Sequence, residues 1–166
     1  MWTGVESIGL GKMEIDKERT LIIVKPDGVQ RGLIGEVVSR FEKRGFKIAG
    51  LKMMQISREL AERHYEAHVG KPFFDSLVEF MTSSPVVVLA VQGRDAVKLA
   101  RNMMGALDPR ESAPGSIRGD LAISKRFNVI HGSDSPENGA REVSLFFAPE
   151  EIFDYPRDME NWLKHD

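Results

Sequence analysis

The run Thr20-Leu21-Ile22-Ile23-Val24-Lys25-Pro26-Asp27-Gly28 is β-branched and mostly apolar before it changes to turn-forming residues. Such a run predicts a short strand. Pro26-Asp27-Gly28 predicts the turn that ends it, since proline presets φ and glycine accepts a positive φ. Apolar residues then recur at helical spacing over 34–41, with Gly45 as a natural helix end. Because residues 46–55 are typical of a second strand, this part of the chain predicts a β-α-β unit.

The second half of the chain repeats this order of elements. Its strongest signal is the continuous apolar run 86–91, which is typical of a strand buried on both faces. The predicted elements are helices over 57–68 and 73–81, a strand over 86–91, a helix over 95–104, a strand over 127–130 and a helix over 140–147.

Without the smaller helices, the order β-α-β occurs twice, which is the ferredoxin-like arrangement. We therefore predict an α+β fold of type βαββαβ, with a four-stranded antiparallel sheet and added helices. A long loop over residues 106–119, rich in proline and glycine, lies between the predicted helix 95–104 and the predicted strand 127–130. A loop of that length in a compact domain is usually functional.

Composition restricts the class of protein. A chain of 166 residues fits one domain, and it contains no cysteine on which a disulfide could form. No run approaches the roughly 20 apolar residues of a membrane span, so we expect a cytoplasmic protein. The net charge of −2 gives no overall basic field that would attract nucleic acid. Affinity for phosphates must come from a local group of cations.

His131 is the first candidate for chemistry. It lies in Asn128-Val129-Ile130-His131-Gly132-Ser133-Asp134-Ser135, where an apolar strand is expected to give way to a polar turn. Its neutral form is well populated near neutral pH, which makes it a nucleophile. Gly132 would remove bulk beside the imidazole, and Ser133 could orient the ring. A lone histidine is more often structural, so the motif alone leaves that alternative open.

Three cations could hold a polyphosphate: Lys25, Arg101 and Arg118. Guanidinium groups match phosphate oxygens at two points, and phosphoryl transfer depends largely on positioning and charge neutralisation. Each of them could equally be a solvated surface charge.

Other devices for phosphate or metal are missing from the sequence. The spacing of Gly45 and Gly50 is followed by Leu51-Lys52, where a P-loop needs Lys and then Ser or Thr. His64 and His68 lie four residues apart, but His-Tyr-Glu-Ala-His is not the zincin order. We interpret this pair as an exposed helix face and expect no metal ligand in the chain. Phe73 and Phe74 are by default core residues.

Taken together, five segments closely resemble the motifs of nucleoside diphosphate kinases, in order and spacing from Glu18 to Phe147. They are Glu18-Arg19-Thr20-Leu21, Val24-Lys25-Pro26-Asp27-Gly28-Val29-Gln30-Arg31-Gly32-Leu33, Pro72-Phe73-Phe74, Pro114-Gly115-Ser116-Ile117-Arg118-Gly119-Asp120 and Asn128-x-x-His131-Gly132-Ser133-Asp134-Ser135. The last segment is highly specific. The resemblance implies a ferredoxin-like fold and an enzyme that moves the γ-phosphate of an NTP to an NDP through phospho-His131.

The resemblance also implies roles for single residues. Glu142 would hydrogen-bond the other ring nitrogen of His131, with Ser133 in support. Phe73 would stack on the base, with Leu77 beside it. Facing the phosphates would be Lys25, Tyr65, Arg101 and Arg118, and reaching the ribose would be Asn128 with Lys25. The implied cofactor is Mg²⁺, carried by the nucleotide phosphates without a direct protein ligand.

Two further expectations concern the chain ends and the assembly. Residues 1–17 are expected to be an N-terminal extension, and 18–166 the kinase domain. The resemblance implies a homo-oligomer, for which the long C-terminal segment favours a hexamer over a tetramer. The segment carries Phe153, Tyr155 and Trp162, so it is expected to pack on a neighbouring subunit or on its own domain.

One residue departs from the family pattern. Leu107 stands where family members usually carry a threonine whose hydroxyl donates to a phosphate oxygen. Leucine cannot donate, so we expect a slower enzyme, unless Leu107 turns inward or Ser112 or Ser116 replaces the hydroxyl.

Two rival functions remain at this point. A regulatory paralogue with weak or no turnover would share the fold, although intact His131, Lys25, Arg118 and Glu142 argue against it. A nucleic-acid-binding module would need a basic, aromatic sheet face, whereas these strands are rich in Val, Ile and Leu.

Overall fold

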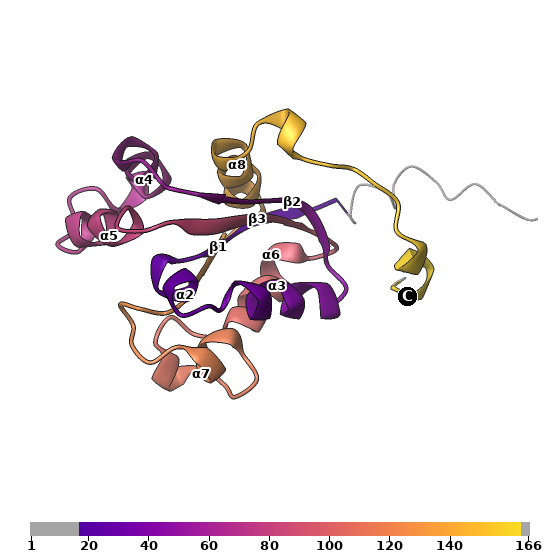
Figure 1. Ribbon diagram of the computed structural model, residues 1–166, viewed down its shortest axis with the longest axis horizontal. Helices are drawn as coiled ribbons and strands as arrows, with labels where there is room; N and C mark the ends of the chain where they lie inside the picture. The colour runs from indigo at the N-terminus through magenta and orange to yellow at the C-terminus, as the bar shows by residue number, and fades with distance from the viewer. Residues whose placement is uncertain (1–16, 164–166) are drawn as a thin grey trace, which may run out of the picture.

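Four strands form one antiparallel sheet in the computed structural model, which describes residues 17–163 (Figure 1). The strands are β1 (Arg19–Val24), β2 (Lys47–Met54), β3 (Val86–Gln92) and β4 (Ile130–Gly132). Their order across the sheet is β2-β3-β1-β4, and every neighbouring pair is antiparallel. A β-α-β unit repeated once gives this order, so the ferredoxin-like α+β prediction is confirmed. Of the expected extension over 1–17, residues 1–16 lie outside the described part of the chain.

Helices cover both faces of the sheet (Figure 1). The α-helices are α2 (Pro26–Gln30), α3 (Ile34–Lys43), α4 (Arg58–His64), α5 (Phe74–Met81), α6 (Ala96–Met104), α7 (Ile117–Leu121) and α8 (Pro136–Phe146). Short 3₁₀ turns are η1 (Glu66–His68), η2 (Pro109–Glu111), η3 (Pro149–Glu151) and η4 (Asp158–Trp162).

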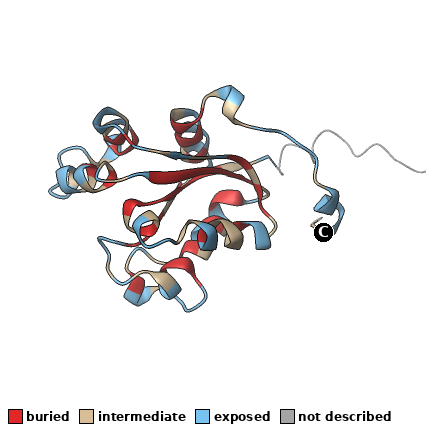
Figure 2. Ribbon diagram, in the orientation of Figure 1, coloured by how far each residue is buried: buried red, intermediate tan, exposed pale blue. Residues whose placement is uncertain are grey.

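Alternation along β1 divides the core into two layers. Leu21 and Ile23 pack with residues of α4, α5 and α8, whereas Ile22 and Val24 pack with residues of α3 and α6. Successive side chains of a strand point to opposite faces, so one run supplies both layers. Burying each such side chain contributes about 1.5–3 kcal/mol. Every residue of β3 is buried (Figure 2), as its continuous apolar run predicts.

Pro26-Asp27-Gly28 does not form the predicted turn but begins the helix α2. Pro26 occupies the start of the helix, where its φ fits and no N–H is needed. Gly28 is required there by close packing rather than by a positive φ. A Cβ on it would lie 2.8 Å from Cγ1 of Val24 and 3.0 Å from the carbonyl oxygen of Val129.

The last strand begins later than predicted, at Ile130 instead of residue 127. Val129 has a φ of 71°, a left-handed conformation that a β-branched residue rarely adopts. Its carbonyl oxygen accepts a hydrogen bond from the amide of Lys25 at 2.8 Å, outside the strand ladder. The kink at Val129 therefore delays β4, which then contains His131.

Several helix boundaries also differ from the sequence prediction. The stretch 57–68 divides into α4 and η1, and α8 begins at Pro136 because Ser135 caps it through the Asn138 amide. The loop 106–119, expected to lack regular structure, contains η2 and the beginning of α7. There Ser116 accepts a hydrogen bond from the Gly119 amide, which is typical of an N-cap.

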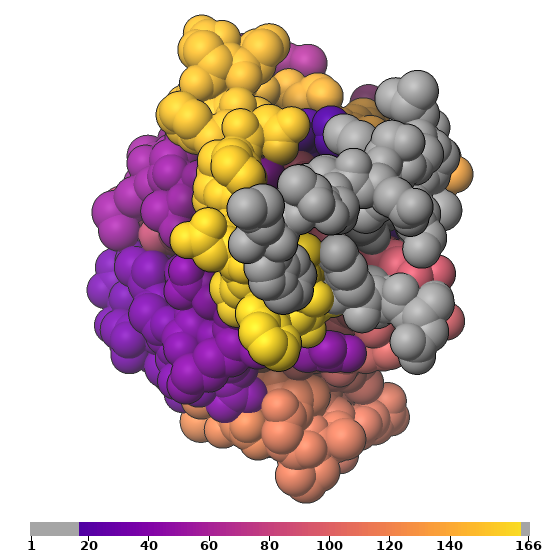
Figure 3. Space-filling view, turned by 90° about the vertical axis from the view of Figure 1, so that its right-hand side faces the viewer, coloured from indigo at the N-terminus to yellow at the C-terminus, as the bar shows by residue number. Residues whose placement is uncertain are grey.

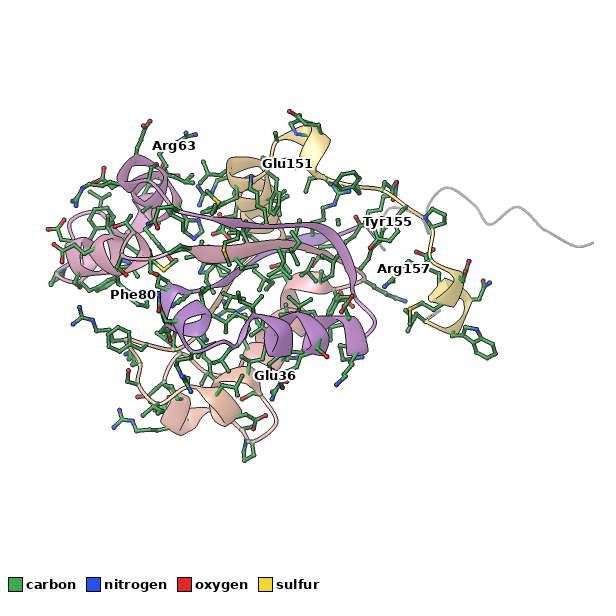
Figure 4. The ribbon with its side chains drawn as sticks, in the orientation of Figure 1. Glu36, Arg63, Phe80, Glu151, Tyr155 and Arg157 are labelled. Atoms are coloured by element: carbon green, nitrogen blue, oxygen red, sulfur yellow. The ribbon has the colours of Figure 1, made fainter. Side chains whose placement is uncertain are left out.

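The C-terminal segment lies along the open edge of β2 (Figure 3). The Phe153 amide donates to the carbonyl oxygen of Ala49 at 2.8 Å. Tyr155 and Arg157 point from the segment to the sheet (Figure 4) and donate to the carbonyl oxygens of Ile48 and Phe46. The segment thus packs on its own domain and covers an edge strand.

No helix within residues 17–163 is both long and apolar enough to cross a membrane.

Candidate active site

His131 lies in the middle of β4 and not at the strand end that its sequence suggested. It pairs with Ile23 of β1, whose side chain belongs to the layer of α4, α5 and α8. Gly132, on the opposite face, does not make room for the imidazole. A Cβ there would lie 2.5 Å from Sδ of Met104, so the glycine admits α6 instead.

Glu142 of α8 holds one nitrogen of the His131 ring. The distance from Nε2 of His131 to Oε2 of Glu142 is 3.3 Å, and the Ser133 hydroxyl donates to the same oxygen at 2.6 Å. Ser133 also accepts the amide hydrogen of Leu21. The predicted grouping of His131, Glu142 and Ser133 therefore exists in the structure.

This arrangement keeps Glu142 ionised and sets the tautomer of His131. Burial alone would raise the pKa of Glu142, but the hydrogen bonds from His131 and Ser133, with the charge of His131, hold that pKa below its ordinary value. A carboxylate accepts only, so Nε2 of His131 carries the hydrogen that faces it. In the neutral ring the lone pair is then on Nδ1, which has no hydrogen-bond partner among residues 17–163. It is the nitrogen available for attack.

Lys25 and Asn128 form the second group. The ammonium of Lys25 donates to Oδ1 of Asn128 at 2.7 Å, and Nδ2 of Asn128 donates to the carbonyl oxygen of Leu107 at 3.1 Å. Burial, and then repulsion by Arg118, lower the pKa of Lys25 to about 8, although Asp27 opposes the shift. A bound anion would stabilise the ammonium and raise the pKa of Lys25 again.

Arg118 of α7 is fixed by backbone oxygens. It donates to the carbonyl oxygens of Gly105 at 3.1 Å and Ile130 at 2.8 Å, while its buried Nε has no partner. Burial, and then the charge of Arg101, lower its pKa to about 10. Lys25 and Arg118 are only 8% and 7% exposed, so they are not the solvated surface charges that the sequence left open. Arg101 is exposed on α6.

Tyr65 lies beside His131, with the two ring centroids 6.1 Å apart. Its buried hydroxyl has no hydrogen-bond partner. Burial and the charge of Glu142 raise the pKa of Tyr65, so it stays protonated and can donate.

The aromatic and apolar candidates are more exposed than Lys25 and Arg118. Phe73 is 48% exposed, which contradicts its default interpretation as a core residue, and the ring of His68 stands edge-on to it at 5.4 Å. Phe74 and Leu77 are partly buried against the core. Leu107 is 57% exposed and therefore does not turn inward.

Sequence reasoning missed His64, which it placed on an exposed helix face. The residue is buried, and its ring centroid lies 4.7 Å from that of His131. A signal existed, because Leu60, Ala61 and His64 recur at helical spacing on the face of α4 that packs on the core.

Asp27 is a second missed residue. Its carboxylate accepts the amide hydrogen of Val129 at 2.9 Å, and the Lys25 amide binds the Val129 carbonyl oxygen. Both bonds hold Val129, the left-handed residue two positions before His131. The segment expected to be a turn therefore positions β4.

Two buried cations, and an imidazole nitrogen without a hydrogen-bond partner among residues 17–163, are groups that phosphoryl transfer can use, here on a ferredoxin-like fold. A family model described as nucleoside diphosphate kinase matches residues 18–152. A curated nucleoside diphosphate kinase of Carboxydothermus hydrogenoformans is 59% identical over 88% of this chain and 98% of its own. The nucleoside diphosphate kinase of Pyrococcus abyssi is 58% identical over 90% of this chain and 96% of its own.

A solved structure agrees with these relatives. The nucleoside diphosphate kinase of Halobacterium salinarum, in complex with CDP, superposes with a TM-score of 0.87 at 48% identity, covering 90% of this chain and 99% of that one. The chain belongs to the nucleoside diphosphate kinase family. The predicted fold, family and phosphotransferase class are thus confirmed, and the regulatory alternative is not favoured.

Proposed function

We propose that the chain exchanges the γ-phosphate between nucleotides in two half-reactions through phospho-His131. The observation that carries the proposal is the His131 ring, whose Nε2 faces Glu142 and whose Nδ1 is free. In the first half, Nδ1 attacks the γ-phosphorus, the bond to the bridging oxygen breaks, and the NDP leaves with that electron pair. In the second half, a β-phosphate oxygen of another NDP attacks the phosphorus, and the P–N bond breaks.

The remaining residues assist the transfer through charge and position. Glu142 stabilises the positive charge that grows on the ring while Nδ1 bonds to phosphorus. Lys25, Arg101 and Arg118 neutralise the phosphate oxygens, and the Tyr65 hydroxyl donates to the moving phosphoryl group. Asn128, with Lys25, is placed for the ribose. An exposed Phe73 offers a face to any base, with Leu77 beside it, which suits an enzyme with loose base preference.

Mg²⁺ would arrive with the nucleotide. It prefers oxygen ligands and binds through few protein groups together with substrate phosphates. Lys25 and Arg118, two of the buried groups proposed to face the phosphates, are cations, which fits a metal held by the phosphates rather than by the chain. When bound, Mg²⁺ offsets phosphate charge.

The proposal is tested with γ-labelled ATP. We expect acid-labile label on His131 that moves to added GDP, and no label on a His131→Asn control. Label that stays bound, or that appears on the control, would refute the two-step route. Absence of label on both would favour the regulatory paralogue.

We also propose a homo-oligomer, with a hexamer favoured over a tetramer. Large apolar side chains remain exposed, among them Ile123, just after α7, and Trp162, which is 88% exposed. Light scattering should give six subunits, and a monomer would contradict the proposal. The cytoplasmic location stays a prediction.

A further inference from the structure

His64 has an unusual environment for a buried polar residue. Its side chain is 1% exposed, and neither ring nitrogen has a hydrogen-bond partner. The rings of Tyr65, Phe146 and His131 surround it with centroids 4.4, 5.1 and 4.7 Å away. Buried polar groups are normally paired, so an unpaired imidazole beside the nucleophile requires an explanation.

The atoms around His64 are spaced like metal ligands. Nδ1 of His64 lies 3.9 Å from Oε1 of Glu142, and Nε2 of His131 lies 3.3 Å from Oε2 of the same residue. One donor atom from each residue falls within 4.8 Å of the others. Ligands about 2.0–2.1 Å from a tetrahedral zinc stand roughly 3.4 Å apart. The two distances to Glu142, 3.3 and 3.9 Å, are close to that spacing.

The donor atoms also suit a cation. Metal binding uses a neutral imidazole and a carboxylate, and neither ring nitrogen of His64 is occupied by a hydrogen bond. Oε2 of Glu142 already accepts from Ser133, which leaves Oε1, next to His64, to turn toward a metal.

We propose that His64, His131 and Glu142 form a site for Zn²⁺ that switches off the nucleophile. Two imidazoles and one carboxylate suit zinc, whereas Mg²⁺ prefers oxygen ligands alone. The His131 side chain is 20% exposed, so one member of the triad is reachable from solvent.

Binding requires the other tautomer of His131. Nε2 loses its hydrogen to solvent, Nδ1 takes up a hydrogen from solvent, and Nε2 donates its electron pair to Zn²⁺. With a hydrogen on Nδ1, the ring has no lone pair for attack, and Glu142 no longer faces an Nε2 hydrogen. The nucleophile is therefore blocked while the metal is bound. This inhibition rests on the proposed function, whereas the binding of zinc does not.

The test measures zinc binding separately from inhibition. Chelator-treated protein is titrated with Zn²⁺ by calorimetry and with Co²⁺ by visible absorption, without nucleotide. We expect saturable binding, with the absorption bands of four-coordinate Co²⁺. Substitution His64→Ala, or His64→Phe if the first variant is unstable, should weaken binding by at least about 100-fold, since one of three ligands is lost. The control His68→Ala removes a nearby histidine outside the triad and should bind as the wild type.

Exchange is then measured with Mg-nucleotide and rising Zn²⁺. Zinc should slow the wild type and His68→Ala at concentrations that leave His64→Ala unaffected, which also controls for zinc held by nucleotides. Equal zinc affinity in the wild type and both His64 variants, or no saturable binding, would overturn the proposal. Zinc binding that depends on His64 in a protein without any exchange would uphold the metal site and refute the proposed function.

Discussion

The side of the site that carries His131 and the side proposed to receive the base are built differently. We call Lys25, Asn128, His131, Ser133 and Glu142 the floor, because they are mostly buried and joined by hydrogen bonds between distant segments. We call Phe73, Arg101 and Leu107 the rim, because these side chains are exposed. The floor is arranged before a ligand binds, which is how preorganised sites lower a barrier. The rim gains its contacts only with the nucleotide, so floor variants should alter the chemical step and rim variants should alter KM.

The largest effect is expected from His131→Asn. Exchange should fall by more than about 1000-fold, because no other side chain of the Asn128-to-Ser135 motif can form the P–N bond. Nucleotide binding measured by calorimetry, and Tm, should change little, since His131 is not part of the buried core. Residual exchange near the wild-type rate would show that the floor is not where the chemistry occurs.

Glu142→Gln should lower kcat by roughly 100-fold with KM nearly unchanged. The amide keeps the size of the carboxylate but removes the charge that holds the His131 tautomer and stabilises the ring cation. Stopped-flow rates of His131 phosphorylation would measure the effect directly. A change in KM alone would assign Glu142 to substrate binding instead of the chemical step.

Phe73→Ala, at the rim, should raise KM about 10-fold and leave kcat largely intact, since stacking on a base contributes roughly 1–3 kcal/mol. Phe73→Trp serves as the matched control and should keep KM near the wild-type value. The two constants come from steady-state exchange with several NDPs. A fall in kcat as large as the rise in KM would contradict the distinction between rim and floor.

Nucleotide affinity should weaken above about pH 8. Lys25 has its pKa lowered to about 8 by burial and by Arg118, so the free protein loses this charge as the pH rises through that value. A bound phosphate favours the ammonium, and the dissociation constant should therefore rise toward tenfold per pH unit between pH 8 and 9. Calorimetry from pH 6 to 9 measures it, and Lys25→Met should remove the dependence.

The smallest effect is expected from Leu107→Thr, which should raise kcat/KM by up to about 10-fold. A hydrogen bond to a charged group contributes roughly 1.5–3 kcal/mol when it is fully formed. The hydroxyls of Ser112 and Ser116 already donate to carbonyl oxygens of their own loop, so neither readily replaces it. Leu107→Val, without a hydroxyl, is the control. Unchanged or lower kcat/KM for the threonine variant would exclude a phosphate contact at this position.

Much of this architecture could be predicted from local pattern. The apolar run of β1 supplies both core layers, and the spacing over 34–41 gives α3. The floor residues were predicted through a motif that resembles a family, not through geometry. Boundaries were less certain: the strand expected over 127–130 starts at Ile130, because the left-handed Val129 depends on contacts with Asp27 and Lys25.

The sequence by itself determined the alternation of strands and helices, because periodicity of apolar residues is a local property. It also pointed to His131 as the proposed nucleophile, through the Asn128-to-Ser135 motif. Only the tertiary structure decided which residues meet His131. His64 becomes its buried neighbour, and Gly132 makes room for Met104 rather than for the ring. These relations join α4, α6 and β4, elements far apart in the chain, and long-range packing leaves no periodic signal in any one of them.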